Sequence, residues 1–175
     1  MTIYSFADAD VDRTVKRVMR EYRPGLADAG VIVQALFAMP SSDANGESSG
    51  PALTKHGYAC CALVKILDLK GRLTRSSDVE LLISRDDWEV MTTEQRNAAV
   101  DHQLAYLELR IDDDGQVLRD SLSRPRLALR KADRLYEWFD EVAARHGQHS
   151  LETTQAASFY HDVGQMYLPG FEVHA

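Results

Sequence analysis

The sequence predicts one α+β domain, in which a mostly antiparallel or mixed sheet of about three to five strands packs on a central helix. Three observations predict this class. Apolar residues recur at helical spacing near both ends of the chain, which indicates flanking N- and C-terminal helices; short β-branched runs fill the first half; and a capped helix follows them. At 175 residues and 45% apolar content the chain can close a single core. We expect the domain over residues 1–147 and a C-terminal tail over 148–175.

The first elements follow from periodicity and from turn-forming residues. Residues 9–22 carry apolar side chains at spacings typical of an amphipathic helix. Residues 31–39 are rich in β-branched residues and too short for a buried helix, so they predict a buried strand. Residues 40–51 combine Ser, Asn, Gly and Pro with almost no apolar side chain, and they predict a flexible loop.

Two further strands and the start of the central helix come next. Residues 58–67 and 79–83 are predicted to pair as neighbouring strands, joined by a turn at Lys70-Gly71, and a short turn follows at Asp86-Asp87-Trp88. Thr92 and Gln95 then have the spacing of a capping box, in which each side chain satisfies the other residue's free amide. The central helix should begin there.

The central helix is expected to run on through Arg110 and to be apolar on two sides. On a helical wheel Val100 and Leu104 share one face, while His102 and Tyr106 share a second. Asp101 and Gln103 fall on the polar seams between these faces. One face should pack against the sheet and the other beneath another element.

The remaining third of the chain predicts weaker elements. Residues 112–115 read Asp-Asp-Asp-Gly and predict a turn. They resemble the start of a calcium-binding loop, but the distal ligands and the terminal Glu of such a loop are missing. Short extended pieces are expected at residues 116–119 and 126–129. Residues 131–146 regain helical spacing with Gly147 as the C-terminal cap, and a short helix through Phe159 is expected in the tail.

The residues His102-Gln103-Leu104-Ala105-Tyr106 occupy the frame of the zinc-peptidase motif H-E-x-x-H. Together with several flanking segments they resemble the putative phage metallopeptidase family, whose fold is similar to small SprT-like zincins. The resemblance covers roughly residues 9–147. The matching segments are Tyr22-Arg23-Pro24, Asp86-Asp87-Trp88, Glu94-Gln95-Arg96, Asp101-His102-Gln103-Leu104 and Asp112-Asp113-Asp114-Gly115.

The resemblance implies a zinc site of which this chain keeps only one residue. His102 matches the first ligand, Gln103 stands at the catalytic Glu, Tyr106 stands at the second His, and Ala132 stands at a later His. A Gln amide cannot take a proton from a zinc-bound water, and one imidazole would not hold zinc against solvent. We therefore predict that zinc is lost, that no cofactor is bound and that no catalytic residue remains.

Histidine and cysteine residues outside the motif have structural interpretations. His102 is expected to be buried and hydrogen-bonded, with the Tyr106 hydroxyl as its natural partner. His146 and His149 are expected at a helix end and on the surface. Cys60 and Cys61 are adjacent, so in a strand they point to opposite faces and cannot easily bridge, which favours a reducing cytoplasm.

Charge limits the classes of partner. The formal net charge of −7 argues against broad binding to nucleic acid or to an anionic membrane, and no apolar run is long enough to cross one. Basic residues concentrate only in the segment 119–134. Its candidate binding residues are Arg124, Arg126, Arg130, Lys131 and Arg134. A solvated sheet edge guarded by charge is the simpler interpretation, and docking of an acidic partner or a nucleic-acid backbone is the functional one.

These observations lead to one main hypothesis and two alternatives. The main hypothesis is a catalytically inactive metallopeptidase-like protein of phage or prophage origin that binds a protein partner. The first alternative is an atypical metal-dependent hydrolase, with His146, His149 or His161 folding back toward His102. The second is a nucleic-acid-binding protein that uses the segment 119–134, whose affinity would fall steeply with salt.

Overall fold

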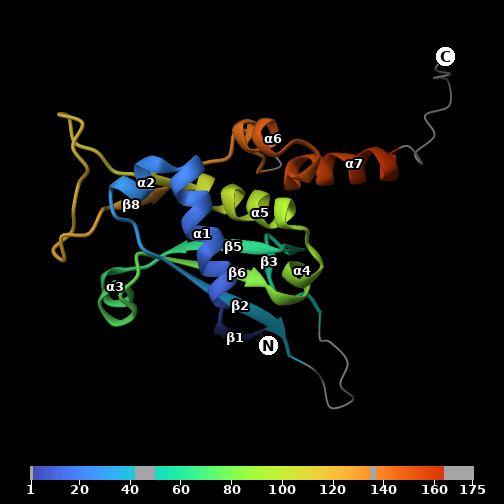
Figure 1. Ribbon diagram of the computed structural model, residues 1–175, viewed down its shortest axis with the longest axis horizontal. Helices are drawn as coiled ribbons and strands as arrows, with labels where there is room; N and C mark the ends of the chain where they lie inside the picture. Colours follow the sequence, from blue (N-terminus) through green and yellow to red (C-terminus); the bar gives the residue numbers. More distant parts are fainter. Residues whose placement is uncertain (1, 42–49, 135–136, 164–175) are drawn as a thin grey trace.

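The computed structural model describes residues 2–41, 50–134 and 137–163, with side chains up to residue 158. It has the predicted α+β class, with helices layered over a mixed sheet (Figure 1). In chain order the elements are β1 (Thr2–Phe6), α1 (Ala9–Tyr22), α2 (Pro24–Asp28), β2 (Val33–Pro40), β3 (Thr54–Lys55), β4 (Tyr58–Ala59), β5 (Ala62–Ile66), α3 (Leu69–Arg75), β6 (Val79–Ser84), α4 (Arg85–Val90), α5 (Thr93–Ala105), β7 (Leu107–Leu109), β8 (Leu127–Leu129), α6 (Asp140–His146), the 3₁₀ turn η1 (Gly147–His149) and α7 (Leu151–Val163).

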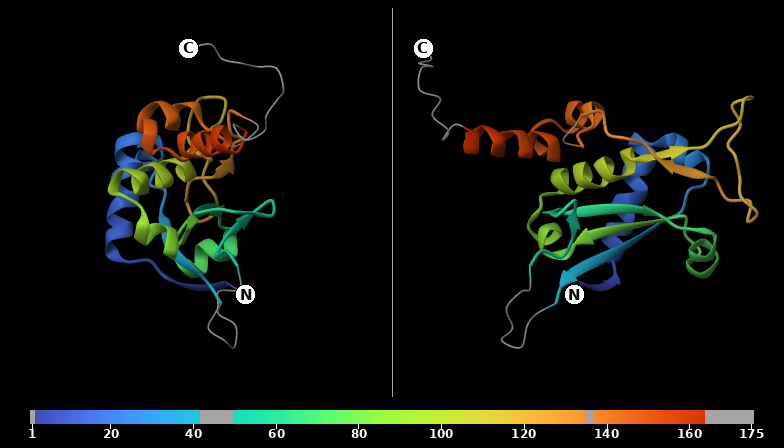
Figure 2. Two further views of the ribbon diagram at one scale, coloured as in Figure 1. Left: turned by 90° about the vertical axis from the view of Figure 1, so that its right-hand side faces the viewer. Right: turned by 180° about the vertical axis from the view of Figure 1, so that it is seen from behind.

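The main sheet has the strand order β1-β2-β6-β5, and only the central pair β2–β6 is parallel. The predicted neighbours β5 and β6 do pair, antiparallel, with Leu63 opposite Leu82. Figure 2 shows α1 and α5 on one side of the sheet, with α6 and α7 as a further layer beyond α5. The central helix therefore lies between the sheet and the C-terminal helices.

The core forms where the alternating residues of the central strands meet α1 and α5. Ala35 and Phe37 of β2 and Leu81 and Ile83 of β6 face this layer, since opposite residues in the register share a side of the sheet. Val11, Val15 and Val18 of α1 complete the packing, as the helical spacing predicts. On the other side of the sheet a smaller cluster of Ala38, Ala52 and Leu53 covers part of the surface, and Tyr4 and Phe6 at the β1 edge remain exposed.

Helix α5 begins as predicted at a complete capping box. The Thr92 hydroxyl accepts a hydrogen bond from the Gln95 amide at 3.3 Å, and the Gln95 side chain accepts one from the Thr92 amide at 2.9 Å. Its two apolar sides are both used, because Val100 and Leu104 join the core while Ala105 belongs to a second cluster under α6. The two-sided packing that the helical wheel predicts is thus present.

Removing this cap should weaken the helix on which the second cluster is built. We expect Thr92→Ala to lower the free energy of unfolding by about 1 kcal/mol, because a free amide at the helix start loses its acceptor. Urea denaturation followed by circular dichroism measures the change. Thr93→Ala, one residue into the helix and exposed, is the matched control. Equal stability of the two variants would contradict a role for the cap.

The end of α5 differs from the prediction. The helix stops at Ala105 with Tyr106 as its C-cap, instead of running on through Arg110. Residues 107–109 form β7 and pair antiparallel with β8, so a long-range strand pairing overrides the helical pattern. Asp101 and Gln103, expected on polar seams, are buried, because the C-terminal helices and the segment after Tyr22 close over those sides too.

Several weaker predictions need correction. The turn predicted at Lys70-Gly71 lies inside α3, whose start is capped by Asp68 accepting from the Gly71 amide at 2.7 Å. The turn predicted around Trp88 is the short helix α4. The apolar run 58–67 is broken at the two cysteines into β4 and β5. Strand β1 was not predicted at all.

The helix predicted over residues 131–146 is confirmed only from Asp140 onward. The preceding stretch folds back, with Glu137 in the left-handed region at φ +62° and the Asp140 amide donating to Asp133 at 3.0 Å. Gly147, with φ +53°, ends α6 as predicted. The turn 112–115 is also present, with the Asp112 carboxylate accepting from two later amides.

Some predictions lie beyond what the structure describes. Residues 42–49 of the predicted loop are outside the described residues. The division into a domain over 1–147 and a tail over 148–175 stays a prediction, although the first turn of α7 contacts α5. No helix within the described ranges is both long and apolar enough to cross a membrane.

Candidate functional site

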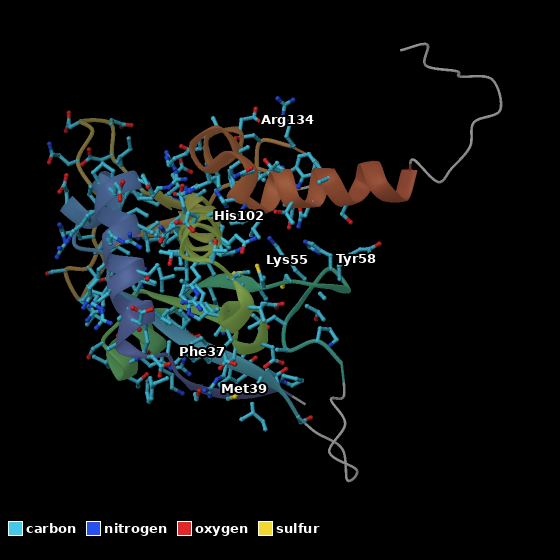
Figure 3. All side chains as sticks on the ribbon, turned by 45° about the vertical axis from the view of Figure 1, so that its right-hand side comes forward. Phe37, Met39, Lys55, Tyr58, His102 and Arg134 are labelled. Carbon is cyan, nitrogen blue, oxygen red and sulfur yellow. The ribbon has the colours of Figure 1, made fainter. Side chains whose placement is uncertain are left out.

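The motif positions of α5 and the later position in the chain meet in one aromatic cluster. His102 and Tyr106 stack edge to face with their ring centroids 5.5 Å apart, and Phe139 lies against both rings at 5.3 and 4.7 Å. Ala132 packs against the same cluster. The fold therefore brings together the three positions at which the resemblance implies zinc ligands. Figure 3 shows His102 on α5, below the C-terminal helices.

His102 has a carboxylate partner that the sequence did not reveal. Its Nδ1 lies 2.7 Å from Oε1 of Glu152 in the first turn of α7, and both side chains are buried. A carboxylate can only accept here, so Nδ1 carries a proton and donates it in this hydrogen bond. The same Glu152 oxygen accepts from the Phe139 amide at 3.3 Å. The expectation that Tyr106 is the partner of His102 is wrong, because its hydroxyl donates to the Glu137 carbonyl at 3.3 Å.

Burial alone would raise the pKa of Glu152, but the hydrogen bond and charge of His102, together with backbone amides, outweigh it and lower this pKa. A carboxyl whose folded pKa is depressed stabilises the fold fully above its ordinary value of 4.5. This contribution is lost as the pH falls through the lower, folded value. The pair is therefore a source of acid sensitivity.

We expect the free energy of unfolding to decline below about pH 4.5, with part of this decline absent in Glu152→Gln. The amide cannot take up a proton in this range, so the linked term disappears. Urea titrations at a series of pH values measure it, and Glu108→Gln at an exposed position is the matched control. Parallel pH profiles for the wild type and Glu152→Gln would show that the pair carries no linked stability.

Tyr106 is held as a neutral phenol under a cation. The ammonium of Lys55, in β3, lies 4.2 Å from the centre of the Tyr106 ring and 2.9 Å from the Glu137 carboxylate. His56 approaches the same carboxylate at 3.4 Å. Burial is the largest effect on Tyr106 and raises the pKa of its phenol, although Lys55 acts in the opposite direction. At neutral pH the hydroxyl therefore stays protonated.

These donors do not fit a zinc ion. The family scheme would need imidazoles at positions 106 and 132, where this chain has a protonated phenol and a methyl group, and Gln103 offers no general base. The Lys55 ammonium adds positive charge beside the ring that stands in the second ligand position. Among the described residues no group of three His, Cys, Asp or Glu side chains is arranged to hold a metal ion.

The other histidines do not gather at His102. His146 turns its Nε2 to Asp101 at 3.0 Å, on a different side of α5. The half-buried His149 contacts the side chain of its neighbour Gln148 at 3.3 Å. The side chain of His161 is outside the described residues. Cys60 and Cys61 are free thiols, and burial raises the pKa of Cys61 to about 12.

Asp101, which is completely buried, is the centre of a second cluster. Its Oδ1 accepts from Arg23 Nε at 2.8 Å, and its Oδ2 accepts from Arg145 as well as His146. Arg23 also reaches Glu141 at 2.7 Å. The cluster joins the segment after α1 to α5 and α6. Sequence reasoning missed it, since nothing local to Asp101 announces partners more than forty residues away.

The basic segment is largely neutralised within the chain. Arg124 lies 3.4 Å from Asp78, Arg130 lies 2.7 Å from Glu141, and Arg134 lies 2.9 Å from Asp140. Arg126 and Lys131 are exposed, and in the described part of the chain neither has a carboxylate partner. Arg126 lines a groove with residues of β5 and α3, whereas Arg130 and Arg134 pair with carboxylates of α6.

Comparison with known proteins gives one family. Residues 3–164 match the family described as Putative phage metallopeptidase, a range that includes β1 and α7 in addition to the segments that carried the resemblance. Neither the curated proteins nor the solved structures include a match to this chain. Three observations point to the same family. They are the fold with its central helix, the frame of the motif at residues 102–106, and the match over nearly the whole length. The chain belongs to the putative phage metallopeptidase family.

Proposed function

We propose that this chain is a non-catalytic member of its family that acts by binding a protein partner. The proposal rests on the side chains that occupy the three positions at which the family would have zinc ligands. His102 is paired with Glu152 inside the fold, Tyr106 is a protonated phenol beneath Lys55, and Ala132 is a methyl group in the same cluster. Each of these groups contributes to packing, and none replaces a lost ligand.

The chemistry of each position supports this proposal. Peptide hydrolysis by a zincin needs a metal-bound water and a carboxylate that removes its proton. Gln103 is an amide, which does not accept that proton at any ordinary pH. A single imidazole at His102 would not retain zinc in water, because stable sites have three or four protein ligands. Zinc and the family reaction are thus proposed to be lost together.

The two alternatives gain less support. A rearranged metal site would need another histidine near His102, and His146 is instead engaged with Asp101. Nucleic-acid binding through residues 119–134 would need free cations, and three of the five candidate residues are paired with carboxylates. A phage or prophage origin, and with it a place in the bacterial cytoplasm, is proposed from the family alone.

A peptidase assay tests the proposal. With an unfolded, fluorescently labelled casein as substrate and zinc supplied in excess, we expect the wild type to cleave no faster than His102→Ala. Cleavage by the wild type that is abolished both by a zinc chelator and by His102→Ala would contradict the proposal. Circular dichroism of both proteins controls for folding.

A further inference from the structure

A groove lies between the end of β5, the start of α3 and the arm that leads into β8. Its apolar lining comes from Ile66, Leu67, Leu69 and Leu127, and its volume is about 520 Å³. Leu69 is half exposed there. We call this feature the β5–α3 groove. Helix α3 lies at the opposite end of the sheet from the β3–β4 hairpin (Figure 1), whose Lys55 lies over the Tyr106 ring.

Three guanidinium groups line the β5–α3 groove, and only one of them is neutralised. Arg72 donates to Asp120 at 2.9 Å. The Asp120 carboxylate also accepts from the amides of Leu122 and Arg124 at 2.9 and 3.1 Å, so both of its oxygens are already engaged. It is the only carboxylate among the described residues that line the groove. The groove therefore keeps an excess of positive charge that faces solvent.

The two other guanidinium groups keep their charge. Arg119 donates to the carbonyl oxygens of Ser123 and Ala29 at 2.9 and 3.5 Å, which are neutral acceptors. Arg126 is exposed, and within the described ranges it has neither an ion pair nor a side-chain hydrogen bond. An apolar floor beside two uncompensated cations is therefore present in a chain whose net charge is −7.

We propose that the β5–α3 groove binds a segment of a partner protein that carries both carboxylates and large aliphatic or aromatic side chains. Arg126 and Arg119 would pair with the carboxylates, since guanidinium groups bind them in a forked geometry. The aliphatic side chains would fill the apolar floor and gain from leaving water. This inference rests on the proposed binding role and adds to it a surface and a chemical class of partner.

A nucleic acid fits the same groove less well. Its phosphates could meet the guanidinium groups, but a sugar–phosphate backbone offers little to bury against four aliphatic side chains. A long polyanion would also be repelled by the net negative charge of the rest of the molecule. A short acidic and apolar protein segment meets both features, and because it carries few charges the repulsion is smaller.

The test uses a short dansyl-labelled peptide composed of Asp, Glu, Leu and Phe residues, with a counterpart that has Lys at the acidic positions. We expect the acidic peptide to bind the full chain and the basic one not to bind. Arg126→Glu should weaken binding at least about tenfold, because an attractive charge becomes repulsive. Arg126→Lys should retain most of the affinity, and Leu69→Asp should lose it through the apolar floor.

Lys131→Glu is the matched control, because it makes the same charge change at an exposed site outside the β5–α3 groove. The affinity of this variant for the acidic peptide should stay within about twofold of the wild type, since Lys131 does not line the groove and salt screens charges that make no direct contact. An equal loss in Lys131→Glu, no binding of the acidic peptide, or stronger and Arg126-dependent binding of an oligonucleotide would each overturn the inference. Zinc-dependent peptidase activity would instead remove the proposed function, and it would leave the peptide titration unaffected.

Discussion

Asp101→Ala is expected to lower the free energy of unfolding by about 3–5 kcal/mol. Asp101 is completely buried, and it is the shared acceptor for Arg23, Arg145 and His146. Removing it leaves the guanidinium groups of Arg23 and Arg145 with only the exposed Glu141 carboxylate as a shared counter-charge. The loss is large because these partly buried charges lose their buried acceptor, and because three segments of the chain lose their junction.

Urea denaturation at neutral pH measures this effect, with circular dichroism as the probe. Asp101→Asn keeps the shape and one acceptor oxygen, so its stability should fall between the wild type and Asp101→Ala. It also keeps the test usable if Asp101→Ala does not fold. Asp10→Ala is the matched control, since Asp10 makes only an exposed ion pair with Arg13 at 3.2 Å and should change little. Equal effects at the two positions would contradict a structural role for the buried cluster.

The second large effect is a gain of zinc binding. We expect the triple variant Gln103→Glu, Tyr106→His and Ala132→His to bind zinc at least about a thousandfold more tightly than the wild type. Tyr106 stacks on His102 and Ala132 packs against the same cluster, so both new imidazoles would be added beside His102. Glu152 would then hold Nδ1 of His102 and leave Nε2 for the metal, as carboxylates commonly do for zinc-bound histidines.

Competition with a chromogenic zinc chelator measures the affinity of the triple variant. The same three substitutions combined with His102→Ala are the control, and they should bind far more weakly. A gain that survives without His102 would mean that zinc is held elsewhere. A triple variant that folds but binds zinc no better than the wild type would contradict the assignment of these positions.

The sequence predicts local elements well where the signal is local. The capping box at Thr92 and Gln95 sets the start of α5, and the apolar spacing of residues 9–22 sets α1, because short-range geometry decides both. The pairing of β5 with β6 follows from the two predicted strands at residues 58–67 and 79–83. The class of the fold and the buried state of His102 could therefore be predicted.

The errors arise where distant residues decide the outcome. Residues 107–109 pair with β8, so α5 ends before them although the apolar spacing of the sequence predicts that the helix continues. Residues 131–139 have helical spacing, yet Phe139 donates its amide to Glu152 and packs on Tyr106. The partners of His102 and Asp101 come from α6, α7 and the segment after α1, and no pattern in one sequence couples such positions.

The zinc content of the wild-type protein separates a chain that has lost its metal site from one that still holds zinc. The chain is incubated with excess zinc, dialysed, and analysed by mass spectrometry for metal per mole of protein, alongside His102→Ala. We predict that both proteins retain far less than one zinc ion per chain, and to the same extent. About one zinc ion per chain in the wild type, lost in His102→Ala, would contradict the account.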